Sequence, residues 1–523
     1  MSDLLDPRIP YNLAEQFVDR HVAGGRGESP AIRCEGRIWT YRRLSEQINR
    51  AGHLLKSLGV EEEQRVLIVL PDSPDFVVSY FAAIKIGAVA VPTNTALSSE
   101  EYRACLDDSR ARVLVLTADL LPRVSPILVD RPYLKHVMVV GRDDSEGSSW
   151  ERRLREHSPA LEPAPTTGDD SAFWLWTSGS TGRPRATVHL HQDWKHCCEG
   201  YARGVLGITQ EDITFSASKL FHAYGLGNGL MFPFYVGATT VLYPGKPTVD
   251  GIRAIVARDR PSLFFSVPTS YAAMLREIEA SAEGSPALDF SSVRAAVSAA
   301  EPLAADIFTR FARTFGVEIL DGLGSTEVLH IYLSARPGRV RPGSVGQPVP
   351  GYEIRVTGAD GSASADGEIG DLLVRGRSTA ASYWNRRRTT TERMRGEWFH
   401  TGDKGYRDRD GYFWYAGRSD DMFRVSGEWV SPIELEQALA GHGAVLEAAA
   451  VPYQDDQQVT KAVAFVVVKP GASRGDDLAR ELQAFVRERL THYKCPRRIV
   501  FVDALPKTAA GKIQRLKLRS DVV

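Results

Sequence analysis

The sequence lacks several features that would assign a protein to a class at once. Its 64 basic and 65 acidic side chains give a net charge of −1, so no overall positive field attracts nucleic acid or an anionic membrane. It has five cysteines, an odd number, and no C-x-x-C pair, which argues against a disulfide framework or a zinc ribbon. We therefore expect a reducing, cytoplasmic setting and partners that are recognised locally.

Long hydrophobic runs are also missing. The longest, residues 77–92, is interrupted by Lys85 and is too short to span a bilayer. The first ten residues, MSDLLDPRIP, are acidic and contain two prolines, which is untypical of a signal peptide. We expect neither a signal peptide nor a membrane segment.

Two common catalytic motifs are absent as well. No G-x-x-x-x-G-K-[ST] segment occurs, which argues against a P-loop ATPase. A glycine two residues before Ser180 would complete the G-x-S-x-G motif of serine hydrolases, but that position is Ser178.

The sequence does contain a regular alternation of apolar strands and helical stretches. Strands are expected at residues 66–70, 89–91, 113–116, 263–267 and 293–297. An amphipathic stretch ends at Lys85, and Ser98 with Glu101 forms a capping box that predicts a helix start. This alternation is typical of parallel sheets covered by helices.

The pattern changes near Asp420. A strand at residues 462–468 and a helix at residues 476–490 indicate a smaller α+β unit. A chain of 523 residues is expected to form about two or more domains. The fold class is therefore α/β and α+β: a large N-terminal domain, residues 1–419, with mixed and parallel sheets covered by helices, and a small C-terminal domain, residues 420–523.

The segment TSGSTGRPRAT, residues 177–187, has the chemistry of a phosphate-binding loop. It follows an expected strand at residues 173–176 and places four hydroxyl side chains and two glycines in its first six positions. Backbone N–H groups and hydroxyls at a strand end can hold an anion, and glycine lets the main chain approach it closely. A flexible Ser/Gly linker has a similar composition, so composition alone leaves both interpretations open.

Four further segments, together with this loop, carry a family resemblance. They are DGLGSTE at residues 321–327, WFHTGD at residues 398–403, GRSDD…SGEWVSPIELE at residues 417–436 and LPKTAAGKIQR at residues 505–515. From WTYRRL at Trp39 onward the chain resembles the adenylate-forming superfamily of acyl-CoA ligases, adenylation domains and luciferases. The segments FHAYGLGNG and RPGSVGQPVPGYE look most like those of benzoate and hydroxybenzoate CoA ligases.

The resemblance implies a nucleotide site that brings a carboxylate and ATP together. Joining these two anions requires N–H dipoles, cations and Mg²⁺ around the developing charge. Glu327 would help hold Mg²⁺, and Lys512 would bridge the carboxylate and the α-phosphate. The predicted catalytic residues are Lys512, Glu327, Thr326 and His222. The predicted cofactor-binding residues are Thr177, Ser178, Gly179, Ser180, Thr181, Gly182, Arg185, Glu301, Asp321, Gly322, Leu323, Asp403, Arg418, Ser426 and Gly427.

Individual residue types in this set also have plainer explanations. Glu327 could cap a helix, Asp403 after Thr-Gly could be a turn residue, and Lys512 could be a solvated side chain. The order of the motifs favours the ATP roles: Thr326 contacts phosphate, Asp403 beside Arg418 binds the ribose hydroxyls, and Ser426 with Gly427 lines the channel for the pantetheine arm of CoA. Asp420 would be the hinge on which the small, mobile domain turns between the two half-reactions.

The acid substrate is expected to be aromatic. Imidazole and aromatic faces suit a flat ring that carries a carboxylate, although either could instead be a core residue. The predicted substrate residues are His222, Ala223, Tyr224, Ser298, Ala299, Ala300, Gly324, Leu329, His330 and Arg424. Three histidines at 189, 191 and 196 could suggest a metal site, but no carboxylate or thiolate accompanies them in our interpretation.

The phosphate loop departs from the family pattern at its end. The family has P-K-G where this chain has Pro184, Arg185 and Ala186. Arginine keeps the charge but has a different reach and geometry, and alanine has less backbone freedom than glycine. We therefore expect adenylation to be weak relative to thioester formation, and Arg185→Lys with Ala186→Gly to raise the rate of pyrophosphate release; brisk adenylation that this double change slows would instead indicate a loop adapted to arginine. Ligases of this type often have lysine at the position of Arg424, so the exchange of lysine for arginine recurs there.

The sequence therefore predicts a ligase that uses ATP and Mg²⁺ to form an aryl-AMP and then an aryl-CoA thioester. Its partners are a small carboxylic acid, ATP and coenzyme A, with no nucleic acid and no membrane. Two alternatives remain: an adenylation enzyme that loads a carrier protein, and a ligase that retains mainly thioester formation. A nucleotide-binding module without catalysis is a third, and the sequence leaves a homodimer open.

Overall fold

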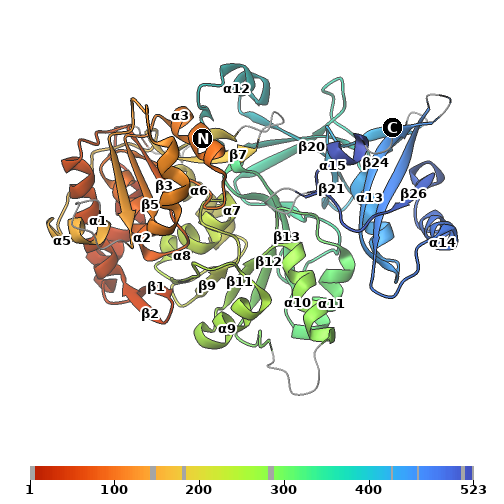
Figure 1. Ribbon diagram of the computed structural model, residues 1–523, viewed down its shortest axis with the longest axis horizontal. Coiled ribbons are helices and arrows are strands. Elements are labelled where there is room, and N and C mark those ends of the chain that lie inside the picture. The colour runs from red at the N-terminus through yellow and green to blue at the C-terminus, as the bar shows by residue number, and fades with distance from the viewer. Residues whose placement is uncertain are drawn as a thin grey trace.

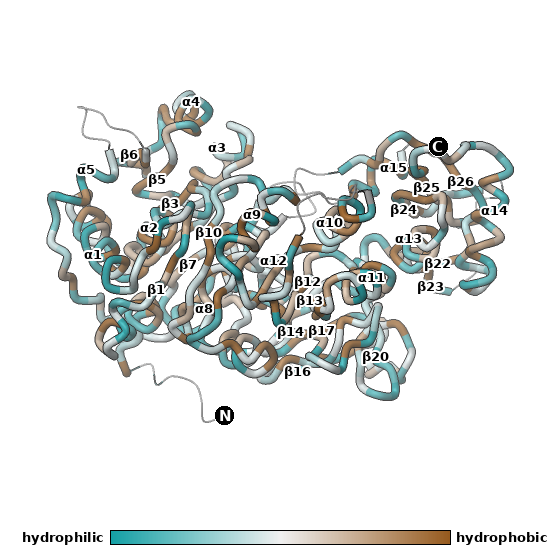
Figure 2. Tube along the Cα trace, turned by 90° about the horizontal axis from the view of Figure 1, so that it is seen from below, coloured by the Kyte–Doolittle hydropathy of each residue, from teal (hydrophilic) through white to brown (hydrophobic). Residues whose placement is uncertain are grey.

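The computed structural model describes residue 6 and residues 8–141, 149–178, 184–280, 288–425, 428–455, 457, 459–507 and 513–520, without the side chains of Ser178 and Ala280. Within these residues the strands form three larger sheets, whose elements precede Asp420, and two smaller sheets that follow it. In Figures 1 and 2 the elements after Asp420 gather at one end of the molecule, apart from the rest. This arrangement agrees with the predicted fold class.

The first part of the chain builds a sheet that has seven strands among the described residues, in the order β18-β8-β7-β4-β3-β5-β6. They are β3 (Arg65–Val69), β4 (Val89–Pro92), β5 (Val113–Thr117), β6 (His136–Val140), β7 (Ser171–Ser178), β8 (Pro184–Leu190) and β18 (Ser382–Tyr383). The strands from β6 to β7 are parallel, and β8 and β18 are antiparallel additions at one edge. The predicted strands at 66–70, 89–91, 113–116 and 173–176 are confirmed to within about two residues.

Helices cover this sheet. They are α1 (Tyr41–Ser57), α2 (Pro74–Lys85), α3 (Ser99–Ser109), α4 (Leu121–Val124) and α5 (Trp150–Arg155). The capping box of α3 is confirmed: Ser98 Oγ accepts from Glu101 N, and the Glu101 carboxylate accepts from Ser98 N.

The prediction that the stretch ending at Lys85 is amphipathic is wrong. Every residue of α2 except Asp75 is buried, because β3 and β4 cover one side of the helix and α1 packs on it as well. The Phe81 ring also stacks with Phe234 of α8 (Phe232–Val236). Lys85 is tolerated in this core because its ammonium lies 2.6 Å from an Asp19 carboxylate oxygen.

The second sheet has nine strands within the described residues, in the order β15-β14-β13-β12-β11-β9-β10-β1-β2. They are β1 (Pro30–Cys34), β2 (Arg37–Thr40), β9 (Ile213–Ser216), β10 (Thr239–Leu242), β11 (Leu263–Ser266), β12 (Ala295–Ser298), β13 (Ile319–Gly324), β14 (Ile331–Ser334) and β15 (Gln347–Pro348). The strands from β1 to β13 are parallel. The strands expected at 263–267 and 293–297 are confirmed as β11 and β12.

Further helices accompany this sheet. They are α6 (Asp193–Cys197), α7 (Ala223–Leu226), α8, α9 (Val249–Asp259), α10 (Pro268–Ala280) and α11 (Ala305–Phe315). Side chains of α9, α10 and α11 form a continuous apolar cluster with strand residues such as Phe264. Figure 1 shows these helices on the outer side of the sheet, which leaves the strand ends near β7 and β20 for the site.

The third sheet has five strands among the described residues, β16 (Tyr352–Thr357), β17 (Gly370–Gly376), β19 (Met394–Arg395), β20 (Trp398–Arg407) and β21 (Phe413–Arg418). The short helix α12 (Arg387–Arg393) precedes β19.

The elements after Asp420 begin with a hairpin, β22 (Phe423–Val425) and β23 (Glu428–Val430). Helices α13 (Pro432–Ala440), α14 (Asp476–Arg487) and α15 (Arg515–Ser520) accompany a sheet of β24 (Val445–Gln454), β25 (Thr460–Val468) and β26 (Arg498–Phe501). Strands β24 and β25 are brown, that is hydrophobic, in Figure 2. The predicted strand 462–468 and helix 476–490 are confirmed as β25 and α14. No helix in the described ranges has the length and apolar character needed to cross a bilayer.

Candidate active site

The carboxyl ends of β11, β12 and β13 bring polar side chains into one row. The register places Ser266 beside Ser298, and Ser298 beside Asp321. All three are buried, and among the described residues Ser266 Oγ has no hydrogen-bond partner. Burial raises the pKa of Asp321 well above its usual range, which favours the neutral carboxylic acid. In parallel sheets this edge is where ligands bind.

A tight turn follows β13 and presents the Thr326 and Glu327 side chains. Ser325 Oγ accepts from Val328 N, and Thr326 O accepts from Leu329 N at 3.1 Å. Leu329 has a φ of +76°, which is a strained backbone conformation for a branched side chain. Contacts from the surrounding residues must therefore hold the turn in this conformation.

The Glu327 carboxylate is buried and held by a distant tyrosine. Tyr383 Oη, on β18, donates to Glu327 Oε1 at 2.8 Å. Among the described residues no hydrogen bond reaches Glu327 Oε2, so one carboxylate oxygen is left to coordinate a cation. The composition of the site thus fits the predicted Mg²⁺ ligand.

Arg185 reaches the same tyrosine from β8. Its guanidinium lies over the Tyr383 ring, 5.2 Å from the ring centroid, and its buried Nε has no hydrogen-bond partner within the part of the chain that the structure describes. Thr177 pairs with Arg185 in the β7–β8 hairpin, so both ends of the predicted phosphate loop are described. The predicted residues Gly179, Ser180, Thr181 and Gly182 lie outside the described residues, as does the Ser178 side chain.

The histidines at positions 189, 191 and 196 each have a different partner. His189 Nδ1 lies 3.0 Å from Asp193 Oδ2, and its Nε2 lies 2.9 Å from Thr326 O. His191 Nδ1 accepts from Leu13 N, and His196 contacts Gln192. A carboxylate, that of Asp193, therefore does accompany His189. It holds the imidazole that contacts the Thr326 carbonyl.

The predicted ribose anchor and its arginine lie side by side. Asp403 of β20 and Arg418 of β21 are partners in the sheet, with Arg418 Nη1 2.9 Å from Asp403 Oδ1. Burial raises the pKa of Asp403, while the Arg418 charge opposes this shift. Tyr415 Oη also donates to Asp403 Oδ1, at 3.4 Å.

The predicted acid pocket is partly assembled. Tyr224 Oη donates to the carbonyls of Ser266 and Val297, and its ring lies 5.5 Å from that of His330. Burial lowers the pKa of His330 to about 3, so its imidazole is neutral. His222, in contrast, occupies the position before α7, and its exposed side chain contacts the Phe221 ring.

The remaining predicted residues have varied surroundings. Ala223, Ser298, Ala299 and Leu329 are buried, while Glu301, Leu323 and Gly324 are half-buried, and a Cβ on Gly322 would meet the Ile331 side chain. Ala300 is exposed with a φ of +74°.

The candidates at the start of the C-terminal part lie near the surface. Asp420 is exposed and lines a surface pocket with Gly402 and His400, next to the Asp403 motif. Arg424 is exposed and lies over the Trp429 ring at 4.5 Å. Ser426, Gly427 and Lys512 lie outside the described residues.

Sequence reasoning missed Tyr383 and Asp193 and gave His189 no role. A tyrosine in SYWN and an aspartate at a helix start carry no catalytic motif. The relevance of Tyr383 and His189 follows only from contacts with residues far away in the sequence. Tyr383 contacts Glu327, 56 positions away, and His189 contacts Thr326, 137 positions away.

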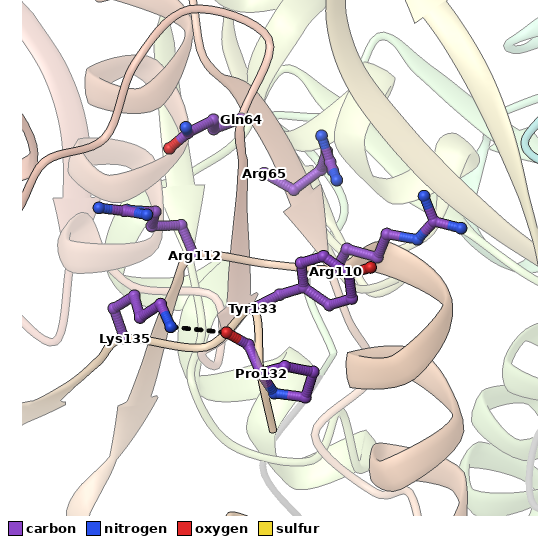
Figure 3. Close-up of a pocket in the computed structure, with 7 residues that line it drawn as sticks. All are labelled: Gln64, Arg65, Arg110, Arg112, Pro132, Tyr133 and Lys135. Atoms are coloured by element: carbon purple, nitrogen blue, oxygen red, sulfur yellow. Dashed lines mark hydrogen bonds between the residues drawn. The ribbon is translucent and has the colours of Figure 1, made fainter. Parts of the chain in front are cut away.

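A basic surface pocket lies where strands of the seven-stranded sheet begin. Arg65, Arg112 and Lys135 stand at the amino-terminal ends of β3, β5 and β6, with Tyr133 between them. Figure 3 shows the guanidinium groups of Arg110 and Arg112 pointing away from each other, and Lys135 Nζ donates to the Pro132 carbonyl. These cations do not converge on one ligand position.

The strand ends, the buried Glu327 carboxylate and the Asp403–Arg418 pair have the donor and acceptor groups that a nucleotide and its cation require. The chain belongs to the AMP-binding enzyme family: the model of the AMP-binding enzyme matches residues 19–384, and that of the AMP-binding enzyme C-terminal domain matches residues 434–512.

Curated relatives are similar over nearly the whole chain. A benzoate–CoA ligase of Thauera aromatica is 46% identical over 517 residues, covering 98% of this chain and 97% of the relative. A 4-hydroxybenzoate–CoA/benzoate–CoA ligase of Rhodopseudomonas palustris is 42% identical, covering 98% of this chain and 94% of the relative.

Solved structures agree. An anthranilate CoA ligase in complex with anthranoyl-AMP has a TM-score of 0.92 at 39% identity, with 99% of this chain and 98% of that chain covered. A benzoate CoA ligase from Burkholderia xenovorans has a TM-score of 0.88 at 42% identity, with 97% and 100% covered.

Proposed function

We propose that this protein is an acid:CoA ligase that activates a benzoate-like carboxylate with ATP and then forms its CoA thioester. The observation that carries the proposal is the Thr326–Glu327 turn after β13, which offers a half-buried hydroxyl and, on the buried Glu327, a carboxylate oxygen that no hydrogen bond among the described residues reaches. The near-complete likeness to benzoate–CoA and hydroxybenzoate–CoA ligases supports the aromatic acid and CoA as the thiol acceptor.

The protein's own groups divide the work of adenylation. Glu327 Oε2 would ligate Mg²⁺, Thr326 would contact the phosphates, and Asp403 with Arg418 would bind the ribose hydroxyls. When bound, Mg²⁺ supplies neutralisation of the charge that develops as pyrophosphate leaves. Arg185 and the backbone N–H groups of residues 177–182 would donate to the same charge.

The row of Ser298, Asp321 and their neighbours supports an adenine and substrate pocket at the strand ends. Glu301, Gly322 and Leu323 would border the nucleotide. The acid would lie against Tyr224 and the neutral His330, with further walls from Ala223, Ala299, Ala300, Gly324 and Leu329. His222 would stand at the pocket entrance, since its side chain is exposed.

The second half-reaction assigns roles to the C-terminal domain, residues 420–523. Asp420 would be its hinge, and Ser426 and Gly427 would line the channel for the pantetheine arm. Lys512 would act in adenylation, and Arg424 near the carboxylate. Loading of a carrier protein, a homodimer and a cytoplasmic location remain predictions from the sequence.

A panel of carboxylates assayed separately for pyrophosphate and for thioester tests the proposal. We expect pyrophosphate release with benzoate, 4-hydroxybenzoate or 2-aminobenzoate, and a thioester that requires CoA. A higher kcat/KM for palmitate than for any benzoate would contradict the aromatic substrate class. Pyrophosphate release without CoA-dependent thioester would favour carrier loading, and no release with any acid would remove the ligase assignment.

A further inference from the structure

The Thr326–Glu327 turn belongs to the nine-stranded sheet but is held from the seven-stranded sheet. Among the described residues, two side chains of the seven-stranded sheet hydrogen-bond to Thr326 and Glu327: His189 on β8 and Tyr383 on β18. These strands are hydrogen-bonded neighbours, with Tyr383 paired to Thr187, two residues before His189. Both contacts therefore start from one edge of the same sheet.

The His189 contact fixes the backbone of the turn. His189 and Asp193 are fully buried, and the His189 ring stacks on Phe173 with an interplanar angle of 10°. Both ring nitrogens face oxygen acceptors, Asp193 Oδ2 on one side and Thr326 O on the other. A proton must therefore lie between His189 and Asp193, while Nε2–H donates to Thr326 O.

The Asp193 carboxylate oxygen is itself held in place. Oδ2 also accepts from Leu190 N at 3.0 Å, so the oxygen that orients the imidazole cannot rotate away without losing that bond. The chain of contacts from Asp193 through His189 thus fixes the direction of the Thr326 carbonyl.

The Tyr383 contact fixes the side chain of the next residue. Its hydroxyl donates to Glu327 Oε1 and leaves Oε2 pointing elsewhere. Ala380 N, three residues before Tyr383, donates to the Glu327 carbonyl at 2.7 Å. One segment therefore holds both the backbone and the carboxylate of Glu327.

We propose that His189 and Tyr383 form a two-point clamp that positions the Thr326–Glu327 turn for the metal–nucleotide complex. The clamp rests on the proposed function, because the metal and ATP are the groups the turn would hold. The two are positioning residues, since neither is assigned a contact with substrate. Loss of either contact should weaken divalent-cation binding and MgATP use and leave binding of the aromatic acid unaffected.

The first test replaces the Tyr383 hydroxyl alone. Tyr383→Phe keeps the ring under Arg185 but frees the Glu327 carboxylate. The matched control is Tyr41→Phe, at the start of α1. It removes another buried hydroxyl, one that donates to Ala238 O at 2.7 Å. Mn²⁺ binding in the presence of α,β-methylene-ATP is followed by the loss of the free Mn²⁺ signal in electron paramagnetic resonance.

We expect Mn²⁺ to bind about 10-fold to 100-fold more weakly to Tyr383→Phe than to the wild type and the control. The KM for MgATP should rise, while the KM for benzoate should stay within about twofold. Equal Mn²⁺ affinity in Tyr383→Phe and Tyr41→Phe would overturn the Tyr383 arm of the clamp.

The second test uses Asp193→Asn. The amide has nearly the same volume, and Leu190 N keeps its oxygen in place, where it can still accept from His189 Nδ1–H. An amide, unlike the Asp193 carboxyl group, cannot carry or balance a second proton on this pair. A neutral His189 that donates from Nδ1 presents a lone pair to Thr326 O, so the contact with the turn is lost. We expect weaker Mn²⁺ binding with the same split between the two KM values.

Unchanged Mn²⁺ affinity in Asp193→Asn would overturn the His189 arm. Thermal unfolding of each variant accompanies the titrations, and a lower melting temperature without a change in Mn²⁺ affinity also counts against the clamp. Because Mn²⁺ binding is measured without an acid substrate, it reports on the clamp even if no benzoate supports pyrophosphate release. Failure of the proposed function and failure of the clamp are therefore distinguishable.

Discussion

Arg185 shows how a single exchange fits its surroundings. Its guanidinium lies over the face of Tyr383, whose hydroxyl is bound to Glu327. A planar guanidinium can stack on an aromatic ring and still direct N–H donors towards phosphate, whereas an ammonium is a point charge. In place of the weak adenylation that the sequence alone led us to expect, this contact favours a loop adapted to arginine.

We therefore expect Arg185→Lys to lower the rate of pyrophosphate release by about tenfold, as the stacking contact and the fork of donors are lost. Adding Ala186→Gly should not restore it, since Ala186 is fully buried in β8. The control is Arg131→Lys, at a surface ion pair with Asp107. A faster rate in the Arg185→Lys, Ala186→Gly double variant would indicate an impaired loop instead.

Asp72 is a buried carboxylate whose charge opposes folding. It accepts from Leu220 N at 3.0 Å, and Lys219 Nζ lies 3.6 Å away. Burial raises its pKa to about 6, although Lys219 lowers it. The folded state thus holds this proton more tightly than the unfolded chain does.

The sign of the pH dependence follows. The stability contribution of Asp72 is fully present below about pH 4 and is lost as the pH rises through about 6. Asp72→Asn resembles the protonated form, so its free energy of unfolding should gain on the wild type between pH 4 and 7. Urea denaturation at several pH values measures this difference, and a difference independent of pH would contradict the assignment.

At the scale of elements, α15 is attached to the C-terminal part by a half-buried ion pair. Arg515 Nη2 lies 2.7 Å from Glu436 Oε2 on α13, and Arg515 also approaches Asp421 at 3.6 Å. Burial raises the pKa of Glu436, and the Arg515 charge opposes this. The short helix thus stabilises a carboxylate that would otherwise be buried alone.

Arg515→Met should destabilise the C-terminal part by about 1–3 kcal/mol, because it leaves the half-buried Glu436 charge without its arginine partner. Glu436→Gln in the same chain should recover much of the loss by removing that charge. Thermal unfolding measures both. A single variant as stable as the wild type would show that the pair contributes little.

At the scale of the whole molecule, side chains connect the parts of the chain before and after Asp420. Among the described residues, Ser431 Oγ donates to Ala416 O, and Lys404 Nζ of β20 lies 4.9 Å from the centroid of the Trp429 ring. The C-terminal elements gather at one end of the molecule in Figure 1, with α13 against β21. This arrangement is compatible with the proposed rotation at Asp420.

Lys512→Ala should reduce pyrophosphate release at least about 100-fold and largely spare thioester formation from supplied benzoyl-AMP, since the lysine is assigned only to the first half-reaction. Lys507→Ala is the control in the same segment, because Lys507 pairs with Glu447 at the surface. Equal loss of both half-reactions in Lys512→Ala would contradict a two-conformation cycle.

The sequence by itself determined the local elements and the class of site. The strands β3, β5 and β25 and the Ser98 capping box follow from side chains that are neighbours in sequence, and ordered motifs indicated the residues of an adenylating site. Such patterns are local, because period and capping depend on only a few successive residues.

Only the tertiary structure decided which distant residues support that site and how α2 is buried. The contacts of His189 with Thr326 and of Tyr383 with Glu327 depend on how two sheets meet, which no local pattern specifies. Helix α2 is buried on nearly every side because sheet and helices enclose it, so the polar face expected from its sequence has no solvent to meet. Long-range packing, rather than local preference, sets both features.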